Sequence, residues 1–177
     1  MALTKVIGSG IGTVTNQFAD ANMSAGSVVQ VVSTTKTDVF SHNTTTYADI
    51  TGLTVNITPR ASSSKILITG HITTGGDDTS PRLVLLRDST AICISTESSG
   101  NVSILSDART SGVRHGVANG FSFLDSPSTT SEITYKWQIK EGHGNATVYV
   151  NKTGFTNSSI DANENATSTI TVMEIAG

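Results

Sequence analysis

Charged residues are scarce in this chain of 177 residues: Asp, Glu, Lys and Arg together make up 14% of it, against ~25% in typical soluble domains. The formal net charge is −3, and the basic residues form no stripe along the sequence. Nucleic-acid binding depends on clustered Lys and Arg side chains that neutralise phosphates. We therefore expect no nucleic-acid partner.

Cysteine is almost absent as well. Cys93 is the only one, so no disulfide framework can form within one chain. It lies in the apolar run Ala91-Ile92-Cys93-Ile94, with no basic neighbour that would stabilise a thiolate. A lone cysteine in such a run is typical of a small buried residue. We predict that Cys93 lies in the core.

Long hydrophobic runs are missing too. No stretch approaches the ~18 apolar residues of a membrane-spanning helix, and the N-terminus lacks the ~7–15-residue apolar segment of a signal peptide. We therefore expect neither membrane insertion nor a secretory leader. In that context the Asn-x-Ser/Thr sequons are by-products of a Thr- and Asn-rich composition rather than glycosylation sites. Examples begin at Asn43, Asn145 and Asn165.

Thr, Ser, Asn and Gly take the place of the charged residues, and hydrophobic residues make up 36% of the chain. Thr is β-branched and fits the half-buried surface of a pleated sheet. Many short Val, Ile and Leu runs interrupt the polar sequence, and disordered segments lack such runs. The composition therefore favours a folded chain built from β-strands.

Alternation of apolar and polar residues identifies the strands. Glu132–Lys140 (EITYKWQIK) places Tyr135 and Trp137 on one face with two isoleucines, and Asp49–Thr58 alternates in the same way. This period of two predicts half-buried strands. We expect further strands at Ser27–Ser33, Lys65–Thr73, Arg82–Asp88, Ala91–Thr96, Val102–Leu105, Asn119–Leu124, Ala146–Asn151 and Ser168–Ile175.

Turn signals separate these strands. Asp88-Ser89-Thr90 predicts a tight hairpin, and Glu141–Asn145 is expected to join Glu132–Lys140 to Ala146–Asn151 as neighbouring strands. No amphipathic helix and no internal repeat is evident. Short strands separated by turns are typical of a sandwich. The predicted fold is an all-β antiparallel β-sandwich, jelly-roll-like, with the strand order left open between a jelly roll and a simpler sandwich.

The first 26 residues differ from the rest. They are small, polar and Gly-rich, without a sustained period. We predict two parts: an extended N-terminal arm over 1–26 and a β-sandwich domain over 27–177. Gly8-Ser9-Gly10-Ile11-Gly12 does not match G-x-G-x-x-G, and no strand precedes it. Nucleotide binding by this segment is therefore not expected.

A search for catalytic or metal-binding motifs finds none. The four histidines are widely spaced and share no ligand motif; they are His42, His71, His115 and His143. No G-x-S-x-G elbow is present. Asp77-Asp78 lacks the spacing of a calcium loop and is expected to be a solvated loop.

The carboxylates and aromatic residues have structural interpretations. Glu132 and Glu174 are expected to pair with Lys or Arg across a sheet, and no pair of carboxylates resembles a glycosidase site. Tyr135 and Trp137 are predicted to be core residues, with Tyr149 packing nearby. We expect no enzymatic activity, no cofactor, and no catalytic or metal residues; partner-binding residues are undetermined.

Several short segments of the chain form familiar phrases. They are Met1–Lys5, Ser24–Gln30, Thr51–Pro59 with Ser62–Ile68, Ser126-Pro127 leading to Thr134–Lys136, and Ser168–Ile175. These segments resemble the small fibre or decoration proteins of bacteriophage virions, of the marine phage type. The resemblance spans most of the chain but contains no catalytic signature.

This resemblance implies an exposed structural component of the virion, either a tail fibre or a capsid decoration (cement) protein. It implies a homotrimer formed through the β-domain and attachment to other virion proteins through the N-terminal arm. The alternative is a receptor- or carbohydrate-binding tip that contacts a host surface glycan. Loops such as Gly75–Ser80 and Asn157–Asn165 would then carry the binding residues.

Overall fold

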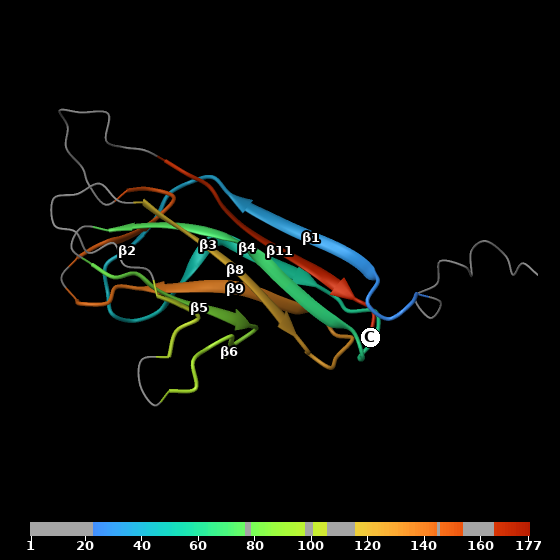
Figure 1. Cartoon of the computed structure of the whole chain (residues 1–177). Helices are drawn as coiled ribbons and strands as arrows, with labels where there is room; N and C mark the ends of the chain where they lie inside the picture. The colour runs from blue at the N-terminus through green and yellow to red at the C-terminus, as the bar shows by residue number, and fades with distance from the viewer. Residues whose placement is uncertain (1–22, 77–78, 98–100, 106–115, 145, 154–164) are drawn as a thin grey trace, which may run out of the picture.

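The structure is a computed structural model that describes residues 23–76, 79–97, 101–105, 116–144, 146–153 and 165–177. Within these ranges the chain forms β-strands and no helix (Figure 1). The strands are β1 (Val28–Lys36), β2 (Phe40–His42), β3 (Ala48–Ile57), β4 (Lys65–Gly76), β5 (Arg82–Arg87), β6 (Thr90–Ile92), β7 (Ile104–Leu105), β8 (Gly116–Asp125), β9 (Ile133–Lys140), β10 (Val148–Val150) and β11 (Ser168–Ile175).

The strands form two antiparallel sheets. Sheet A has the order β1-β11-β4, with β8 on the opposite edge of β4. β10 pairs with the last residues of β4, past the stretch that pairs with β11, and β2 pairs with β10. Sheet B has the order β3-β9-β5-β6, and β7 also pairs with β5. The order β1-β11-β4-β8 against β3-β9-β5-β6 is that of an eight-stranded jelly roll. The predicted all-β, jelly-roll-like sandwich is confirmed, and the strand order is now settled.

The core lies between the sheets because each strand turns its alternate apolar residues inward. Tyr135 and Trp137 of β9 are no more than 1% exposed, as predicted. The ring of Trp137 meets Phe121 of β8 edge to face, with centroids 4.7 Å apart. Their burial confirms that the aromatic face of Glu132–Lys140 faces the core rather than a bound sugar.

One side of the sandwich is closed by side chains of β1. The amide nitrogen of Gln30 donates to the backbone carbonyl of Thr58 at 2.7 Å, and the Thr34 hydroxyl donates to that of Thr54 at 2.9 Å. These bonds join the edge strand of sheet A to the edge strand of sheet B. They satisfy carbonyls of β3 and of the residue just after it, which a free sheet edge would expose.

A second junction between the sheets is polar and buried. Asp125, at the end of β8, is 7% exposed. It accepts a 2.7 Å hydrogen bond from the Tyr135 hydroxyl and an ion pair from Arg87 at 3.0 Å. Burial first, and the Asp125 carboxylate next, raise the pKa of Tyr135. Three strands, β5, β8 and β9, are thereby held together at one end of the sandwich.

Two sequence predictions on individual residues and one on strand pairing are wrong. Cys93 is exposed, because β6 ends at Ile92 and Cys93 itself adopts a left-handed conformation with φ of 53°. Tyr149 lies on the outer side of β10 between two buried valines. Ala146–Asn151 is not the neighbour of Glu132–Lys140: its strand, β10, pairs with β4 and β2 in the other sheet.

The two ends of the sandwich differ. At one end, here called the terminal end, Ala176 is hydrogen-bonded to Gly26 and Ser27, and short turns such as Asp88-Ser89 connect the strands. At the opposite end, here called the loop end, lie 37–47, 79–81, 141–147, 151–153 and 165–167, apart from residue 145. Figure 1 shows the C-terminus at the terminal end, away from β2. The boundary predicted at residues 26/27 stays a prediction, because 1–22 lie outside the described residues.

Candidate functional site

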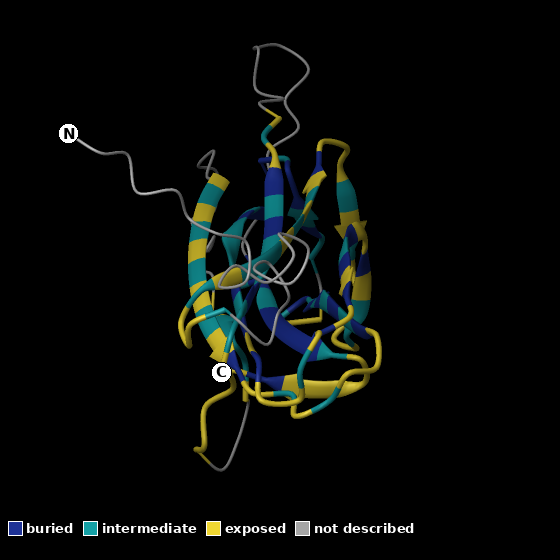
Figure 2. Cartoon of the chain, turned by 90° about the vertical axis from the view of Figure 1, so that its right-hand side faces the viewer, coloured by how far each residue is buried: buried dark blue, intermediate teal, exposed yellow. Residues whose placement is uncertain are grey.

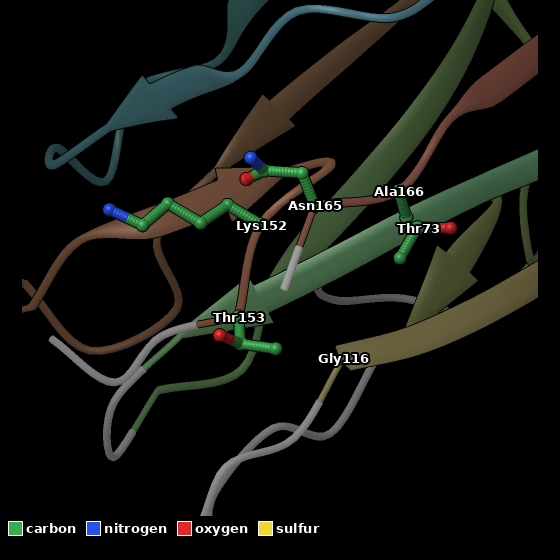
Figure 3. A pocket seen from close by; sticks show the side chains of 6 residues that line it. All are labelled: Thr73, Gly116, Lys152, Thr153, Asn165 and Ala166. Carbon is green, nitrogen blue, oxygen red and sulfur yellow. The ribbon is translucent and has the colours of Figure 1, made fainter. Parts of the chain in front are cut away.

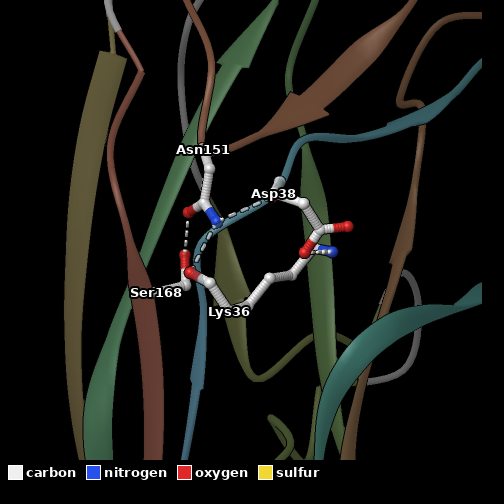
Figure 4. A network of polar contacts seen from close by, with 4 residues as sticks. All are labelled: Lys36, Asp38, Asn151 and Ser168. Carbon is white, nitrogen blue, oxygen red and sulfur yellow. Dashed lines mark hydrogen bonds and ion pairs between the residues drawn. The ribbon is translucent and has the colours of Figure 1, made fainter.

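The loop end is built around Asn151, which is fully buried and adopts a left-handed conformation with φ of 64°. Its side-chain nitrogen donates to the backbone carbonyls of Lys36 and Asp38 at 2.9 and 3.0 Å. Its side-chain oxygen accepts a 2.6 Å hydrogen bond from the Ser168 hydroxyl (Figure 4). One side chain thus fixes the end of β1 and the start of β11 relative to the segment after β10.

Beside Asn151 lies a buried charge. The Lys36 side chain is 1% exposed and its ammonium contacts a carboxylate oxygen of Asp38 at 2.8 Å, while Asp38 itself is 76% exposed (Figure 4). The hydrogen bond from Lys36 is the main cause that lowers the pKa of Asp38. A buried ammonium is costly unless it is paired, so this contact holds Asp38 at the start of the loop end.

Glu141 organises a second part of the loop end. Its carboxylate is fully buried and accepts hydrogen bonds from the Thr79 hydroxyl and from the backbone N–H groups of His143 and Gly144. Its own backbone N–H donates to Thr44 at 2.9 Å. These bonds turn the chain sharply after β9, and the chain then crosses to sheet A instead of returning beside β9.

Two shallow clefts open at the loop end. One, of about 210 Å³, is lined by Thr73, Gly116, Lys152, Thr153, Asn165 and Ala166 (Figure 3). The other, of about 230 Å³, is lined by Ser41, His42, Asn43 and Thr147. Their linings offer hydroxyl and amide groups, one imidazole and one ammonium, and include no carboxylate. Such groups can hydrogen-bond a polar ligand.

Aromatic and basic side chains meet near these clefts. The Lys152 ammonium lies 5.3 Å from the centre of the Tyr149 ring, and that of Lys140 lies 4.6 Å from the centre of the Tyr47 ring. Burial raises the pKa of Tyr47, against a smaller lowering effect of Arg82. The Tyr47 hydroxyl and Arg82 Nε are buried without a hydrogen-bond partner among the described residues.

The histidines do not converge. His42 donates from Nε2 to the Thr46 carbonyl at 2.7 Å, and His71, on sheet A, donates from Nε2 to the Thr167 carbonyl at 3.0 Å. His143 is exposed beside Glu141, and His115 lies outside the described residues. No group of three His, Cys, Asp or Glu side chains in the described ranges has the arrangement of a metal site.

The expected pairing of Glu174 with a cation is wrong. Its buried carboxylate instead accepts hydrogen bonds from Gln30 at 2.6 Å and from the backbone N–H of Arg60 at 2.7 Å. Burial works to raise the pKa of Glu174, but hydrogen bonds from Ser64, Gln30 and the backbone hold it below its ordinary value. Glu132 lies exposed just before β9, and Asp77-Asp78 lies outside the described residues.

Sequence reasoning located the loop end only in part. Asn165, the last residue of the predicted loop Asn157–Asn165, lines the cleft of Figure 3, and Thr79 of Gly75–Ser80 contacts Glu141. The roles of Lys36 and Asn151 were missed because their partners are distant in sequence. Glu141 carried a usable signal, since a carboxylate directly before a Gly-rich turn can accept hydrogen bonds from the turn's own N–H groups.

No family model and no curated protein matches this chain. Solved structures of infectious bursal disease virus are similar over 84% of it: the Gt strain at 12% identity and a TM-score of 0.41, and the Gx strain at 14% and 0.42. The VP2 subviral particle of that virus matches at 12% identity and 0.38. The aligned region spans 36–38% of those longer chains. At these TM-scores the likeness carries no conclusion, and the jelly-roll assignment rests on the strand order.

The sequence also predicted that no membrane-spanning helix is present. Across the part of the chain that the structure describes, no helix has the length and hydropathy that crossing a bilayer requires.

Proposed function

We propose that this protein is a non-enzymatic structural component of a virion, of the bacteriophage fibre or decoration type, that assembles as a homotrimer. Residues 1–26 attach it to other virion proteins at the particle exterior, and the loop end faces outward. The observation that carries this proposal is the difference between the two ends of the sandwich. The junction with the N-terminal segment and the C-terminus share one end, and the long connections share the other.

The terminal end also offers room for an attachment contact. A cleft of about 330 Å³ lies there, between Met23, Arg60 and Gly177, where the segment 1–22 joins the sandwich. A module attached at this end would project its loops away from the attachment point. Loops on a rigid scaffold are where binding residues concentrate.

Particle composition tests the virion role. We expect peptides of this chain in purified phage particles, and we expect antibodies against residues 27–177 to label the particle surface in electron micrographs. Absence of the chain from purified particles, together with its presence in the lysate, would refute the proposal. A copy lacking residues 1–26 should no longer be incorporated, whereas the full chain should be.

A second candidate function, glycan or receptor binding, is favoured by the two clefts at the loop end. Their hydroxyl, amide and ammonium groups match the hydrogen-bonding needs of a sugar or a sugar acid. A glycan array probed with the full chain should show binding that Lys152→Ala or Asn165→Ala weakens. The control Glu132→Ala, at an exposed position just before β9 near the terminal end, should leave binding unchanged. An array without any binding would leave the architectural role alone.

A further inference from the structure

The outer face of sheet A carries residues in regular rows across four strands. The strand registers place Val31 of β1 opposite Met173 of β11, Met173 opposite Leu67 of β4, and Leu67 opposite Leu124 of β8. Val31 is 55% and Leu124 48% exposed. An apolar row, with large exposed residues at both ends, therefore crosses the full width of the four strands.

The next row consists entirely of hydroxyl side chains. Ser33 lies opposite Thr171, Thr171 opposite Thr69, and Thr69 opposite Ser122. The Ser33 and Thr171 hydroxyls are hydrogen-bonded to each other at 2.8 Å. Each hydroxyl can donate one hydrogen bond and accept two. This hydroxyl row can therefore bond to hydrogen-bond donors and to hydrogen-bond acceptors, including another row of hydroxyls.

A third row continues the uncharged surface. It holds Thr35, Thr169, His71 and Gly120 in register. His71 is fixed by contacts of both ring nitrogens, at 3.0 Å to the Thr167 carbonyl and 3.2 Å to the Thr169 hydroxyl. The banding of exposed and intermediate residues along the strands is visible in Figure 2. Of the described residues that these four strands turn outward, Lys65 alone bears a formal charge.

The outer face of sheet B is different. Lys136 contacts Asp49 at 2.8 Å there, and Arg82 lies opposite Lys140 in the strand register. The hydrogen bond from Lys136 is the main cause that lowers the pKa of Asp49. Charged residues are thus collected on the outer face of sheet B and almost excluded from the outer face of sheet A. Depletion of charge is the compositional mark of the centre of a protein interface.

The chemistry of the sheet A face fits a second copy of the same chain. Rotational symmetry brings equivalent side chains of neighbouring subunits together near the axis. Equivalent charges would repel each other, whereas apolar side chains and hydroxyl groups pack or bond with their own kind. A face made of apolar and hydroxyl rows is therefore self-complementary.

The area of the face is close to that of a stable interface. Four strands ~4.8 Å apart and about ten residues of β4 at ~3.4 Å each outline roughly 19 by 34 Å, or about 650 Å². A stable interface of standard size buries ~800 Å² per partner. The face, with the side chains at its margins, therefore approaches the area that a stable oligomer needs.

We propose that the outer face of sheet A is the subunit interface, covered by neighbouring copies of this chain. The inference deepens the proposed function, because it names the surface through which the homo-oligomer forms. It places two rows inside the assembly. The apolar row consists of Val31, Met173, Leu67 and Leu124, and the hydroxyl row consists of Ser33, Thr171, Thr69 and Ser122. Sheet B and the loop end stay accessible.

Charge substitution in the hydroxyl row tests the proposal. Light scattering of the full chain at micromolar concentrations should give an oligomer for the wild type. Thr171→Glu and Ser122→Glu should each weaken association by at least about tenfold, because like charges would meet across the interface. Asn56→Glu, on an exposed position of sheet B, should leave the mass unchanged. Circular dichroism checks that each variant is folded.

Mixing variants of opposite charge sharpens the test. Thr171→Glu and Thr171→Lys should each associate more weakly than the wild type, and an equimolar mixture should associate more strongly than either variant alone, since opposite charges then meet in part of the contacts. A monomeric wild type, an unchanged mass for the Glu variants, or a mixture that associates no more strongly than either variant alone would each overturn the proposal. The chain's presence in particles is measured separately. Failure of the interface and failure of the virion role are therefore distinguishable.

Discussion

Replacing Tyr135 by Phe removes one hydroxyl from the buried junction that joins the two sheets. That hydroxyl donates to Asp125 at 2.7 Å, and Asp125 also receives Arg87 at 3.0 Å. A hydrogen bond to a charged group is worth about 1.5–3 kcal/mol, and the buried carboxylate would lose this donor without gaining water. We expect Tyr135→Phe to lower the free energy of unfolding by about that amount, while the core packing of the ring is kept.

Urea denaturation followed by the fluorescence of buried Trp137 measures this loss. With an m value of about 2 kcal/mol/M, the midpoint should fall by roughly 1 M. Tyr149→Phe is the matched control, because Tyr149 lies on the outer side of β10 and should change the stability by less than about 0.5 kcal/mol. Equal effects of the two substitutions would refute the role assigned to the junction.

The stability difference between the wild type and Tyr135→Phe should also depend on pH. The pKa of Tyr135 is raised in the folded state, so its contribution to stability is fully present below the unfolded value of about 10. It is lost as the pH rises above that value, because only the unfolded chain then releases the proton. The stability difference between wild type and Tyr135→Phe should therefore narrow above about pH 10. A difference that stays constant or widens there would contradict the assigned hydrogen bond.

Three further predictions concern single residues. Asn151→Ala should cost about 2–4 kcal/mol of unfolding free energy in urea titrations, because it removes three buried hydrogen bonds; Asn56→Ala, on an exposed position of β3, should cost almost nothing. Cys93 should react with a maleimide in the native protein, slowly at neutral pH because burial raises the pKa of its thiol; a thiol that reacts only after unfolding would contradict its exposure. Wild-type stability should decline as the pH falls below about 4.3, where the unfolded Glu binds protons, because the pKa of Glu174 is lowered in the fold. In thermal melts, the stability of Glu174→Gln should decline less steeply between pH 5 and 3 than that of the wild type. Identical slopes would exclude the Glu174 carboxylate as a source of the pH dependence.

Strand positions were predictable because alternation and turn chemistry are local. Ser168–Ile175 was predicted with the bounds that β11 has, and the hairpin at Asp88-Ser89 forms as expected. Phe40–His42 was missed, because a strand of three residues shows too little alternation to be detected. Cys93 shows the limit of the same reasoning: its neighbours are apolar, but the conformation at φ of 53° turns it out of the strand.

The candidate site was less predictable than the fold. Its framework depends on contacts between residues far apart in the chain, such as Asn151 with Lys36 and Glu141 with Thr79. A polar residue in a loop gives no local sign of such a partner. The uncharged face of sheet A was likewise invisible in the sequence, because its rows combine residues from four strands.

The sequence by itself determined the all-β class, the central strands and the burial of the Tyr135 and Trp137 face, because these follow from a period of two and from β-branched composition. Only the tertiary structure decided the strand order, the placement of β10 in sheet A, and the division between a loop end and a terminal end. The reason is physical: local propensity acts over a few residues, whereas strand pairing and buried hydrogen bonds are chosen by the whole chain when it closes its core.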